Sequence, residues 1–362
     1  MPVYCFFAII VYIVILILMS MPKVIFDKKN VLVTGGAGFI GSHLCEELIQ
    51  TCKVICVDNF CTGTEANIDH LLHNPDFVFI NHDMSEPLDL ETLPELKKFK
   101  VAFQGIQEVY NLACPMSTKN FAANRQATLL ANSYGVKNAL DLAVKYNAKM
   151  LHFSSSVVYG LRGEGVPEKI KEDFKGVVDV LSDRACYDEG KRFAETMVND
   201  YRRMFNIEAK IVRIFRTFGP RMPLNDNQMI PDFINNALDN QDLTIFGDAN
   251  FSSSFCYVSD VVDAAIKTMD SNLSGPINIG SEEDIKISDI AQFIIEETKA
   301  SSKIIFADKV LFMGDLPLPD IFVARNDLGW MPVMTLKNGL KKTIFDLQAK
   351  KQVRGFGINE VA

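Results

Sequence analysis

Residues 31–58 read VLVTGGAGFIGSHLCEELIQTCKVICVD and decide the fold of the chain. Apolar periodicity in this stretch predicts a strand at 31–33, a helix at 42–50 and a second strand at 53–57. Three glycines precede the helix at the spacing Gly35-x-x-Gly38-x-x-Gly41, the fingerprint of a dinucleotide-binding βαβ unit. Gly35 permits a tight turn, Gly38 leaves room for a pyrophosphate, and Gly41 lets the helix lie close to the sheet. Free N–H groups at the start of the helix then face the phosphates.

Asp58, at the end of the second strand, identifies the dinucleotide. Its carboxylate can accept hydrogen bonds from both ribose hydroxyls, and its charge would repel a 2′-phosphate, so we expect NAD rather than NADP. Asp83 follows the expected third strand, where it can meet the adenine amino group; a helix cap is the alternative. The other residues expected at the cofactor are Phe39, Ile40, Asn59, Met84, Leu112 and Ala113.

Strands and helices alternate through the first 215 residues, which predicts an α/β fold with a Rossmann-type doubly wound parallel sheet. We expect the NAD-binding domain to span residues 21–218, joined by residues 254–281, which contain a strand that returns to the sheet. Residues 219–362 would form mainly a smaller C-terminal α/β lobe for the substrate. Long helices are expected at 126–146 and 184–204.

Composition narrows the class of protein. The chain has 362 residues, of which 48% are hydrophobic and 23% charged, as in an ordinary globular protein. Its net charge of −8 argues against a nucleic-acid-binding surface. Eight cysteines without a C-x-x-C pair indicate buried thiols of a reducing, cytoplasmic compartment, and we expect no metal.

Residues 3–19, VYCFFAIIVYIVILILM, are uninterrupted apolar sequence, at the short limit for crossing a bilayer. Two interpretations stay open. In the first, the segment is a membrane anchor, and the lysines that follow it would keep the catalytic part on the cytoplasmic side. Alternatively it precedes the true start, because Met19 or Met21 would begin a complete soluble enzyme.

Tyr187-x-x-x-Lys191, with Ser155 upstream, carries the expected chemistry. On a helix, residues i and i+4 share a face, so the Lys191 ammonium would lie near the Tyr187 phenol. Lowering a phenol pKa from about 10 to neutrality takes about 4 kcal/mol, which this ammonium and a positive nicotinamide ring can supply together. Tyr187 then acts as a base towards a sugar hydroxyl, Ser155 orients that hydroxyl, and Lys191 also holds the nicotinamide ribose.

The sequence resembles the extended short-chain dehydrogenases/reductases of the sugar-nucleotide epimerase/dehydratase group, and within it the UDP-glucuronate decarboxylases. The stretches that carry the resemblance are Val31–His43, Asp58–Gly63, Asn111–Pro115, Cys186–Arg192, Gly219–Met222 and Phe255–Val258. The resemblance implies oxidation at C4 of a nucleotide sugar, chemistry on the 4-keto intermediate and return of the hydride. It also implies a homodimer through the two long helices.

Several positions depart from the decarboxylase pattern. Val157 stands where the family has Glu in Ser-Thr-Ser-Glu-Val-Tyr-Gly, and the resulting Ser-Ser form is closer to the 4-epimerases. The Asp-Glu pair of dehydratases is absent from this loop. Arg216 replaces a family Asn, while Ser253 and Pro317 replace family Arg residues. Arg216 can bind phosphate in two-pronged fashion or pair with a carboxylate such as Asp226.

We therefore expect the substrate, a nucleotide sugar or sugar phosphate, to contact Ser117, Ser156, Arg216 and Arg221. For Ser117 a solvated loop is the alternative. The net reaction is decarboxylation or 4-epimerisation. The competing hypothesis is a catalytically degenerate relative that binds NAD and regulates or scaffolds a partner; the retained Ser155, Tyr187 and Lys191 favour the enzyme.

Overall fold

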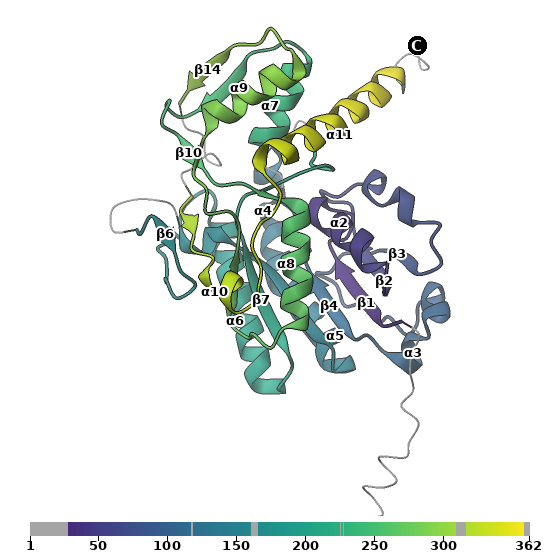
Figure 1. Ribbon diagram of the computed structural model, residues 1–362. Coiled ribbons are helices and arrows are strands. Elements are labelled where there is room, and N and C mark those ends of the chain that lie inside the picture. The colour runs from purple at the N-terminus through teal and green to yellow at the C-terminus, as the bar shows by residue number, and fades with distance from the viewer. Residues whose placement is uncertain are drawn as a thin grey trace, which may run out of the picture.

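The computed structural model describes residues 28–116, 119–160, 166–224, 226, 228–308 and 316–357. Their centre is a seven-stranded sheet in the order β12-β7-β5-β4-β1-β2-β3, in which every neighbouring pair is parallel (Figure 1). The strands are β1 (Asn30–Thr34), β2 (Lys53–Asp58), β3 (Phe77–Asn81), β4 (Glu108–Asn111), β5 (Lys149–Ser155), β7 (Ala209–Ile214) and β12 (Pro276–Ile279). The doubly wound sheet, including the returning strand, is confirmed.

The order reverses beside β1, whose neighbours are β2 on one side and β4 on the other. A crevice forms at such a switch point, outside the carboxyl ends of the strands, and ligands of open α/β sheets bind there. The topology therefore places the glycine turn after β1 at the position expected for a dinucleotide site.

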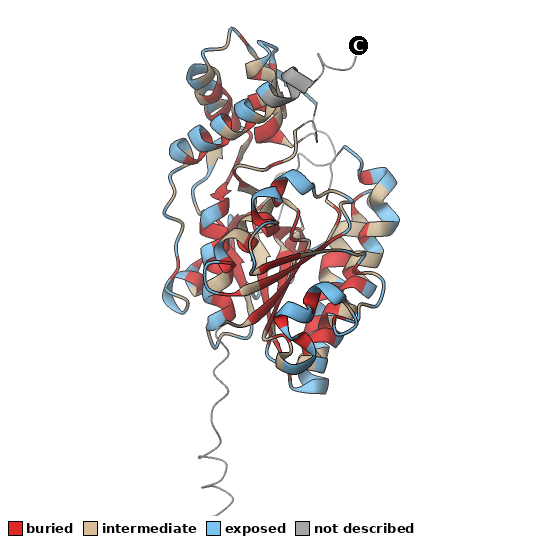
Figure 2. Cartoon of the chain, turned by 90° about the vertical axis from the view of Figure 1, so that its right-hand side faces the viewer, coloured by how far each residue is buried: buried red, intermediate tan, exposed pale blue. Residues whose placement is uncertain are grey.

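Helices cover both faces of the sheet, and buried strands lie between them (Figure 2). One face packs α2 (Phe39–Leu48) and α8 (Val258–Asp270) in one apolar cluster. The other packs α5 (Val136–Tyr146) and α6 (Ala185–Phe205) in a second cluster. Apolar side chains of the strands enter both clusters, which is why the strands read as nearly continuous hydrophobic runs.

Two helix boundaries differ from the sequence-based expectation. α2 begins at Phe39 rather than Ser42, because the glycine turn ends at Gly38, whose extended backbone forms the N-cap. The helix expected at 126–146 begins at Phe121 and is interrupted. It consists of α4 (Phe121–Leu130), a π-helical turn at Ala131–Gly135 and α5. Within this turn the Asn132 side chain donates a hydrogen bond to the Thr128 carbonyl.

A smaller lobe lies beyond the carboxyl ends of the strands, at the top of Figure 1. Its helices, α7 (Met229–Leu238), α9 (Ile287–Thr298) and α11 (Leu336–Gly357), share a third buried cluster with β9 (Leu243–Phe246). β14 (Ile304–Ala307) pairs with β9 in parallel. Residues 318–330 do not belong to this lobe. Ile321, Ala324 of α10 (Phe322–Asn326) and Trp330 pack in the cluster of β1 and α8.

Shorter elements complete the described chain. The two-residue strands pair as β6 (Lys169–Ile170) with β15 (Leu318–Pro319), β8 (Thr217–Phe218) with β11 (Cys256–Tyr257), and β10 (Ser252–Ser253) with β13 (Ile285–Lys286). One helical turn, α3, spans Val101–Gln104, and the 3₁₀ turns are Glu65–Asn67, Asp69–Leu71, Pro94–Phe99 and Ser156–Tyr159.

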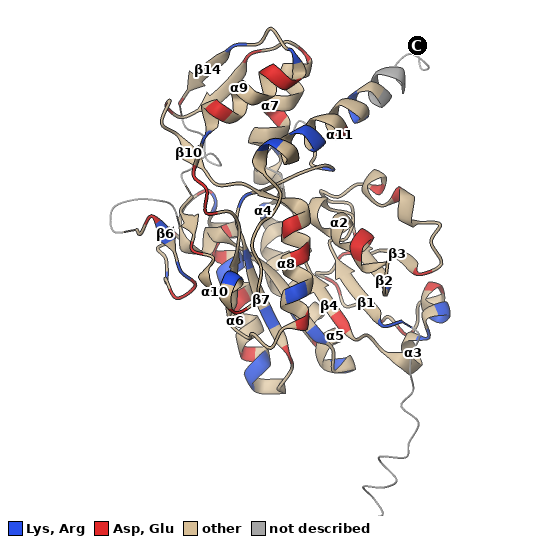
Figure 3. Ribbon diagram, in the orientation of Figure 1, with Lys and Arg blue, Asp and Glu red and all other residues tan. Residues whose placement is uncertain are grey.

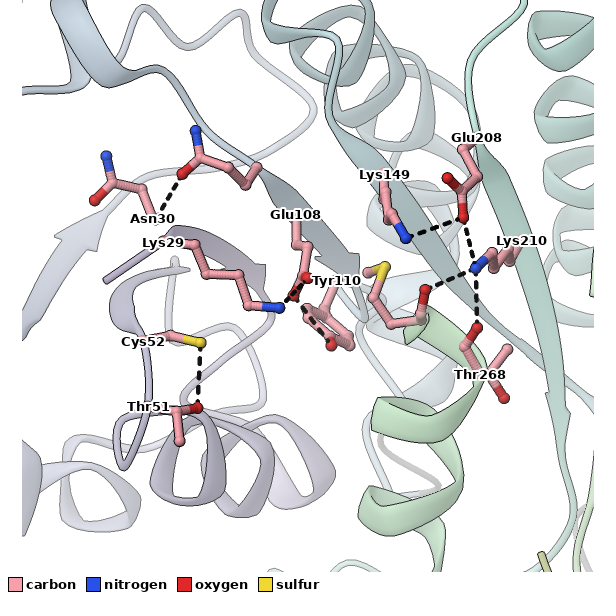
Figure 4. Close-up of polar contacts among 12 residues, drawn as sticks. Lys29, Asn30, Thr51, Cys52, Glu108, Tyr110, Lys149, Glu208, Lys210 and Thr268 are labelled. Atoms are coloured by element: carbon pink, nitrogen blue, oxygen red, sulfur yellow. Dashed lines mark hydrogen bonds and ion pairs between the residues drawn. The ribbon is translucent and has the colours of Figure 1, made fainter. Parts of the chain in front are cut away.

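Polar contacts lie at the amino ends of β4, β5 and β7, at the edge of the sheet away from the smaller lobe (Figure 4). The Lys210 ammonium is buried and donates hydrogen bonds to the carbonyl oxygens of Thr268, at 3.1 Å, and Met269, at 2.6 Å. These carbonyls belong to the last turn of α8, where a helix lacks internal donors and a cation is favoured. Glu208 pairs with the same ammonium at 2.7 Å, so the buried charge is compensated.

Acidic and basic residues are interspersed over the helices in the view of Figure 3. In the part of the chain that the structure describes, no helix is long and apolar enough to cross a membrane. Residues 3–19, the segment for which an anchor was considered, lie outside that part.

Candidate active site

A cavity of about 650 Å³ opens at the carboxyl ends of the strands, between the sheet and the smaller lobe. It collects nearly all residues expected at a cofactor or substrate. Those that line it are Gly35, Gly38, Phe39, Ile40, Gly41, Asp58, Asn59, Asp83, Met84, Leu112, Ala113, Ser155, Ser156, Tyr187, Lys191 and Arg216. Ser117 lies outside the described residues.

Arg221 is not brought to this cavity. Its backbone has a φ of 69°, and its N–H donates to the Asp346 carboxylate of α11 at 2.9 Å. Its guanidinium pairs with Glu46 of α2. Arg221 thus links the smaller lobe to the sheet domain, and the expectation that it contacts substrate is not supported by its position.

The turn between β1 and α2 requires its glycines. Gly35 has a φ of +70°, and a Cβ there would lie 2.8 Å from the Ala113 backbone nitrogen. A Cβ on Gly41 would lie 2.2 Å from the Gly35 carbonyl oxygen, so only glycine lets α2 start this close to the strand. The Gly35 N–H donates to the Val57 carbonyl at 2.8 Å and ties the turn to β2.

Asp58 ends β2 beside this turn and faces the cavity. Its carboxylate accepts hydrogen bonds from the backbone N–H groups of Ala37, at 3.0 Å, and Phe60, at 2.8 Å. Burial raises the pKa of Asp58, and these hydrogen bonds oppose the rise. A glycine cradle with an adjacent, fixed carboxylate fits the pyrophosphate and ribose of a dinucleotide.

Asp83 and Asn59 lie at the same end of the cavity, after β3 and β2. The Asn59 amide donates to Asp83 at 3.0 Å, and Ser85 donates to the other carboxylate oxygen through its N–H and its hydroxyl. Burial would raise the pKa of Asp83, but the hydrogen bonds from Ser85 and Asn59 outweigh it and hold this pKa below its usual value. The adenine contact stays a prediction.

Tyr187, Lys191 and Ser155 meet at the centre of the cavity. Lys191 is buried one turn after Tyr187 on α6, with its ammonium 6.0 Å from the centre of the Tyr187 ring. This ammonium donates to the Phe153 carbonyl at 2.9 Å. The Tyr187 hydroxyl shares a hydrogen bond with Ser155, at the end of β5.

Burial has the largest effect on the pKa of Tyr187 in the chain itself. Burial raises the pKa of this phenol, and the neighbouring Cys114 thiol adds to the rise. The hydrogen bond from Ser155 and the charge of Arg184 act in the opposite direction. Lys191, expected to lower this pKa together with a positive nicotinamide ring, donates from its ammonium to the Phe153 carbonyl.

Val157 is buried in the wall of the cavity, at the position where a carboxylate was expected from the resemblance. Among the described residues of the lining, the acidic ones are Asp58 and Asp83, both near the glycine turn. The described wall around Tyr187 therefore contains no carboxylate. Elimination of water by a dehydratase requires a pair of carboxyl groups that act as acid and base, and the described residues around Tyr187 offer no such pair.

Sequence reasoning missed Arg184, which lines the cavity next to Tyr187. Its carbonyl accepts the N–H groups of Tyr187, at 2.8 Å, and Asp188, at 3.1 Å, so it is the N-cap residue of the helix that carries Tyr187. The signal was present in the sequence, since residues three apart on a helix share a face.

Comparisons with known proteins agree with this geometry. The model of the NAD dependent epimerase/dehydratase family matches residues 31–280. The chain is 40% identical to UDP-glucuronic acid decarboxylase 1 of Danio rerio over 319 residues, covering 88% of this chain and 72% of the relative. It is 36% identical to UDP-glucuronic acid decarboxylase 1 of Arabidopsis thaliana over 322 residues, which cover 89% of this chain and 70% of that relative.

Among solved structures, the chain is similar to UDP-glucuronic acid 4-epimerase of Bacillus cereus in complex with UDP-glucuronic acid and NAD. The TM-score is 0.74 at 27% identity, and the match covers 89% of this chain and 99% of the other.

Proposed function

Because the chain belongs to the NAD-dependent epimerase/dehydratase family, we propose that it modifies a nucleotide sugar through transient oxidation at C4. UDP-glucuronate decarboxylation is the favoured net reaction, since relatives 36–40% identical carry that name. The observation that carries the proposal is the hydrogen-bonded pair of Tyr187 and Ser155, with Lys191 beside it, in the wall of one large cavity.

The residues around the glycine turn would hold NAD. Gly35, Gly38 and Gly41 leave space for the pyrophosphate, and Asp58 would accept hydrogen bonds from the adenosine ribose. Lys191 would hold the nicotinamide ribose. When bound, NAD supplies the acceptor for a hydride from C4 of the sugar.

Tyr187 would remove the proton of the 4-hydroxyl group, and Ser155 would orient that group through the hydrogen bond it shares with Tyr187. Oxidation at C4 turns a uronate into a β-keto acid. Its C5–C6 bond then breaks, carbon dioxide leaves, and the electron pair moves into the C4 carbonyl to give an enolate. The enolate takes up a proton at C5, and Val157 stands where the resemblance places a wall carboxylate.

The second candidate is 4-epimerisation, which is favoured by the Ser154-Ser155-Ser156 loop and by the similarity to the Bacillus cereus 4-epimerase. It needs the same proton transfer by Tyr187, and the 4-keto sugar must then turn over before it is reduced. The alternative of a degenerate NAD-binding protein is not favoured by any observation on the described residues.

We also propose a homodimer. α4 and the π-helical turn that follows it lie beside α6 and expose large apolar side chains. Leu129 of α4 is 50% exposed, Tyr134 of the turn 58% and Phe193 of α6 51%. Burial of such side chains against a second copy is favourable, and a contiguous exposed apolar surface typically marks an interface. Sedimentation equilibrium of the wild type and of a Phe193→Glu variant tests this; a monomeric wild type would reject the dimer.

We propose two alternatives for residues 3–19. Either the segment is a membrane anchor that leaves the catalytic part in the cytoplasm, or translation starts at Met19 or Met21 and the segment is not made. N-terminal sequencing of the protein isolated from its own cells distinguishes them. A first residue at or after 19 rejects the anchor.

The decisive experiment is proton NMR of the purified protein with NAD and UDP-glucuronate in heavy water. UDP-xylose or its 4-keto precursor would establish decarboxylation, with deuterium at C5. UDP-galacturonate would establish epimerisation instead. An unchanged spectrum, with NAD shown to be bound, would reject UDP-glucuronate as the substrate.

A further inference from the structure

We propose that Arg184, backed by Asp188, selects a sugar that carries a carboxylate by binding that carboxylate beside Tyr187. This inference rests on the proposed function and identifies the substrate class of the same site. It concerns a residue that was not among the expected site residues, and it commits the substrate to a uronate rather than a neutral hexose.

The first observation is the position of Arg184. It is 8% exposed, it lines the cavity together with Tyr187 and Ser156, and it immediately precedes α6. Backbone hydrogen bonds from Tyr187 and Asp188 to its carbonyl lock it into the helical register. Residues three apart on a helix lie on one face, so Arg184 and Tyr187 present their side chains to the same region.

The second observation is the ion pair behind it. The Arg184 guanidinium lies 3.1 Å from the Asp188 carboxylate, and both side chains are largely buried. Arg184 lines the cavity, whereas Asp188 is not part of the lining. A guanidinium carries five N–H donors in a planar fork, which suffices to hold Asp188 on one side and a substrate carboxylate on another.

The third observation is the distribution of charge. The described cations of the cavity wall are Arg184, Lys191 and Arg216. Lys191 donates to the Phe153 carbonyl, and Arg216 follows β7 on a different element. The positive charge of Arg184 lowers the pKa of the Tyr187 phenol, whereas burial raises it, so the two side chains interact electrostatically.

The chemistry of a uronate connects these observations. Its carboxylate carbon is attached to C5, the neighbour of C4, so a substrate whose 4-hydroxyl contacts Tyr187 places its carboxylate close to that residue. Arg184 lies three residues before Tyr187, whereas the Lys191 ammonium on the same helix donates to the Phe153 carbonyl. A planar guanidinium matches a carboxylate in two-pronged geometry. A neutral hexose has a hydroxymethyl group there and gains no such pair.

Titration calorimetry on the full chain, saturated with NAD and carrying Tyr187→Phe to prevent turnover, tests the proposal. The three ligands are UDP-glucuronate, UDP-glucose and UDP. Arg184→Gln is expected to weaken UDP-glucuronate binding about 10- to 100-fold, the range for a lost hydrogen bond to a charged group, and the other two by less than about twofold. Arg184→Lys should keep part of the affinity, because it keeps the charge.

Two further variants separate recognition from folding. Arg184→Gln combined with Asp188→Asn leaves no unpaired buried charge and should show the same selective loss. Arg216→Gln is the matched control, and it should not weaken UDP-glucuronate selectively. Equal weakening of all three ligands by Arg184→Gln, or unchanged UDP-glucuronate binding, would overturn the proposal while leaving the proposed function intact. If the parent protein binds none of the three ligands, the proposed function fails with it.

Discussion

Glu195 and Arg213 form a two-pronged ion pair between the helix that carries Tyr187 and the neighbouring strand β7. The two contacts are 2.9 Å and 2.7 Å long, and each side chain is about 12–13% exposed. Ser154, next to Ser155, donates a hydrogen bond to Glu195 Oε1, the oxygen that also accepts the 2.9 Å contact from Arg213. Arg213 also donates to the Tyr159 hydroxyl at 2.7 Å. The pair thus holds α6, β5 and β7 in one arrangement behind the cavity.

Arg213→Met is expected to lower the free energy of unfolding by about 3 kcal/mol, because it leaves the Glu195 carboxylate buried without its partner. Urea unfolding measures the change. The matched control is Lys267→Met, which breaks the exposed pair of Lys267 with Asp263 and should cost less than about 1 kcal/mol. Equal losses for the two variants would contradict a structural role for the buried pair.

Tyr187→Phe removes the hydroxyl that shares a hydrogen bond with Ser155. If this hydroxyl is the base, kcat should fall at least about 100-fold. Bound NAD should stay within about twofold of the wild type. Product formation by NMR and NAD content of the purified protein are the two measurements. The control is Tyr134→Phe, at an exposed helix position. Substantial turnover by Tyr187→Phe would show that another group takes the proton.

Features that depend on local spacing could be predicted from the sequence, because a turn or a helix face is set by neighbouring residues. Gly35 lies in the expected turn, Gly41 lies in the first turn of the helix that follows, and Lys191 lies one turn after Tyr187 as the i, i+4 rule requires. The parallel doubly wound sheet also followed, since an alternating βα pattern predicts parallel strands joined by helices.

Features that depend on tertiary context could not be predicted. The direction of Arg221 follows from its positive φ and from carboxylates on α2 and α11, which lie far away in the sequence. Trp330 packs in the sheet domain, where its indole N–H donates to the Asp260 carbonyl of α8 at 3.0 Å. The two residues are 70 positions apart, so local sequence patterns do not predict this contact. The raised pKa of Tyr187 follows from burial, which the spacing of Tyr and Lys does not reveal.

Arg216 follows β7 and lines the cavity in place of the Asn of the decarboxylase pattern. If it binds the phosphates of the nucleotide sugar, Arg216→Ala should weaken UDP binding about tenfold or more and NAD binding by less than about twofold. Calorimetric titrations with UDP and with NAD make the comparison. Equal weakening of both ligands would place Arg216 in general support of the cavity wall.

Asp232, in the first turn of α7, gives a pH-dependent prediction for stability. Burial, together with the nearby Asp226 carboxylate, raises the pKa of Asp232 to about 6. Between the ordinary carboxyl pKa near 4 and this value, the folded state binds more protons than the unfolded state. The contribution of Asp232 to stability therefore falls as the pH rises through this window.

Asp232→Asn removes this fall. The variant should match the wild type at pH 4 and exceed its free energy of unfolding by about 1 kcal/mol at pH 7.5. The full shift would correspond to about 3 kcal/mol, but solvent screens part of it because the side chain is only partly buried. Urea unfolding at both pH values measures the difference. Asp226→Asn removes the second cause and should give part of the gain. A gain of equal size at both pH values would mean that packing, rather than charge, is responsible.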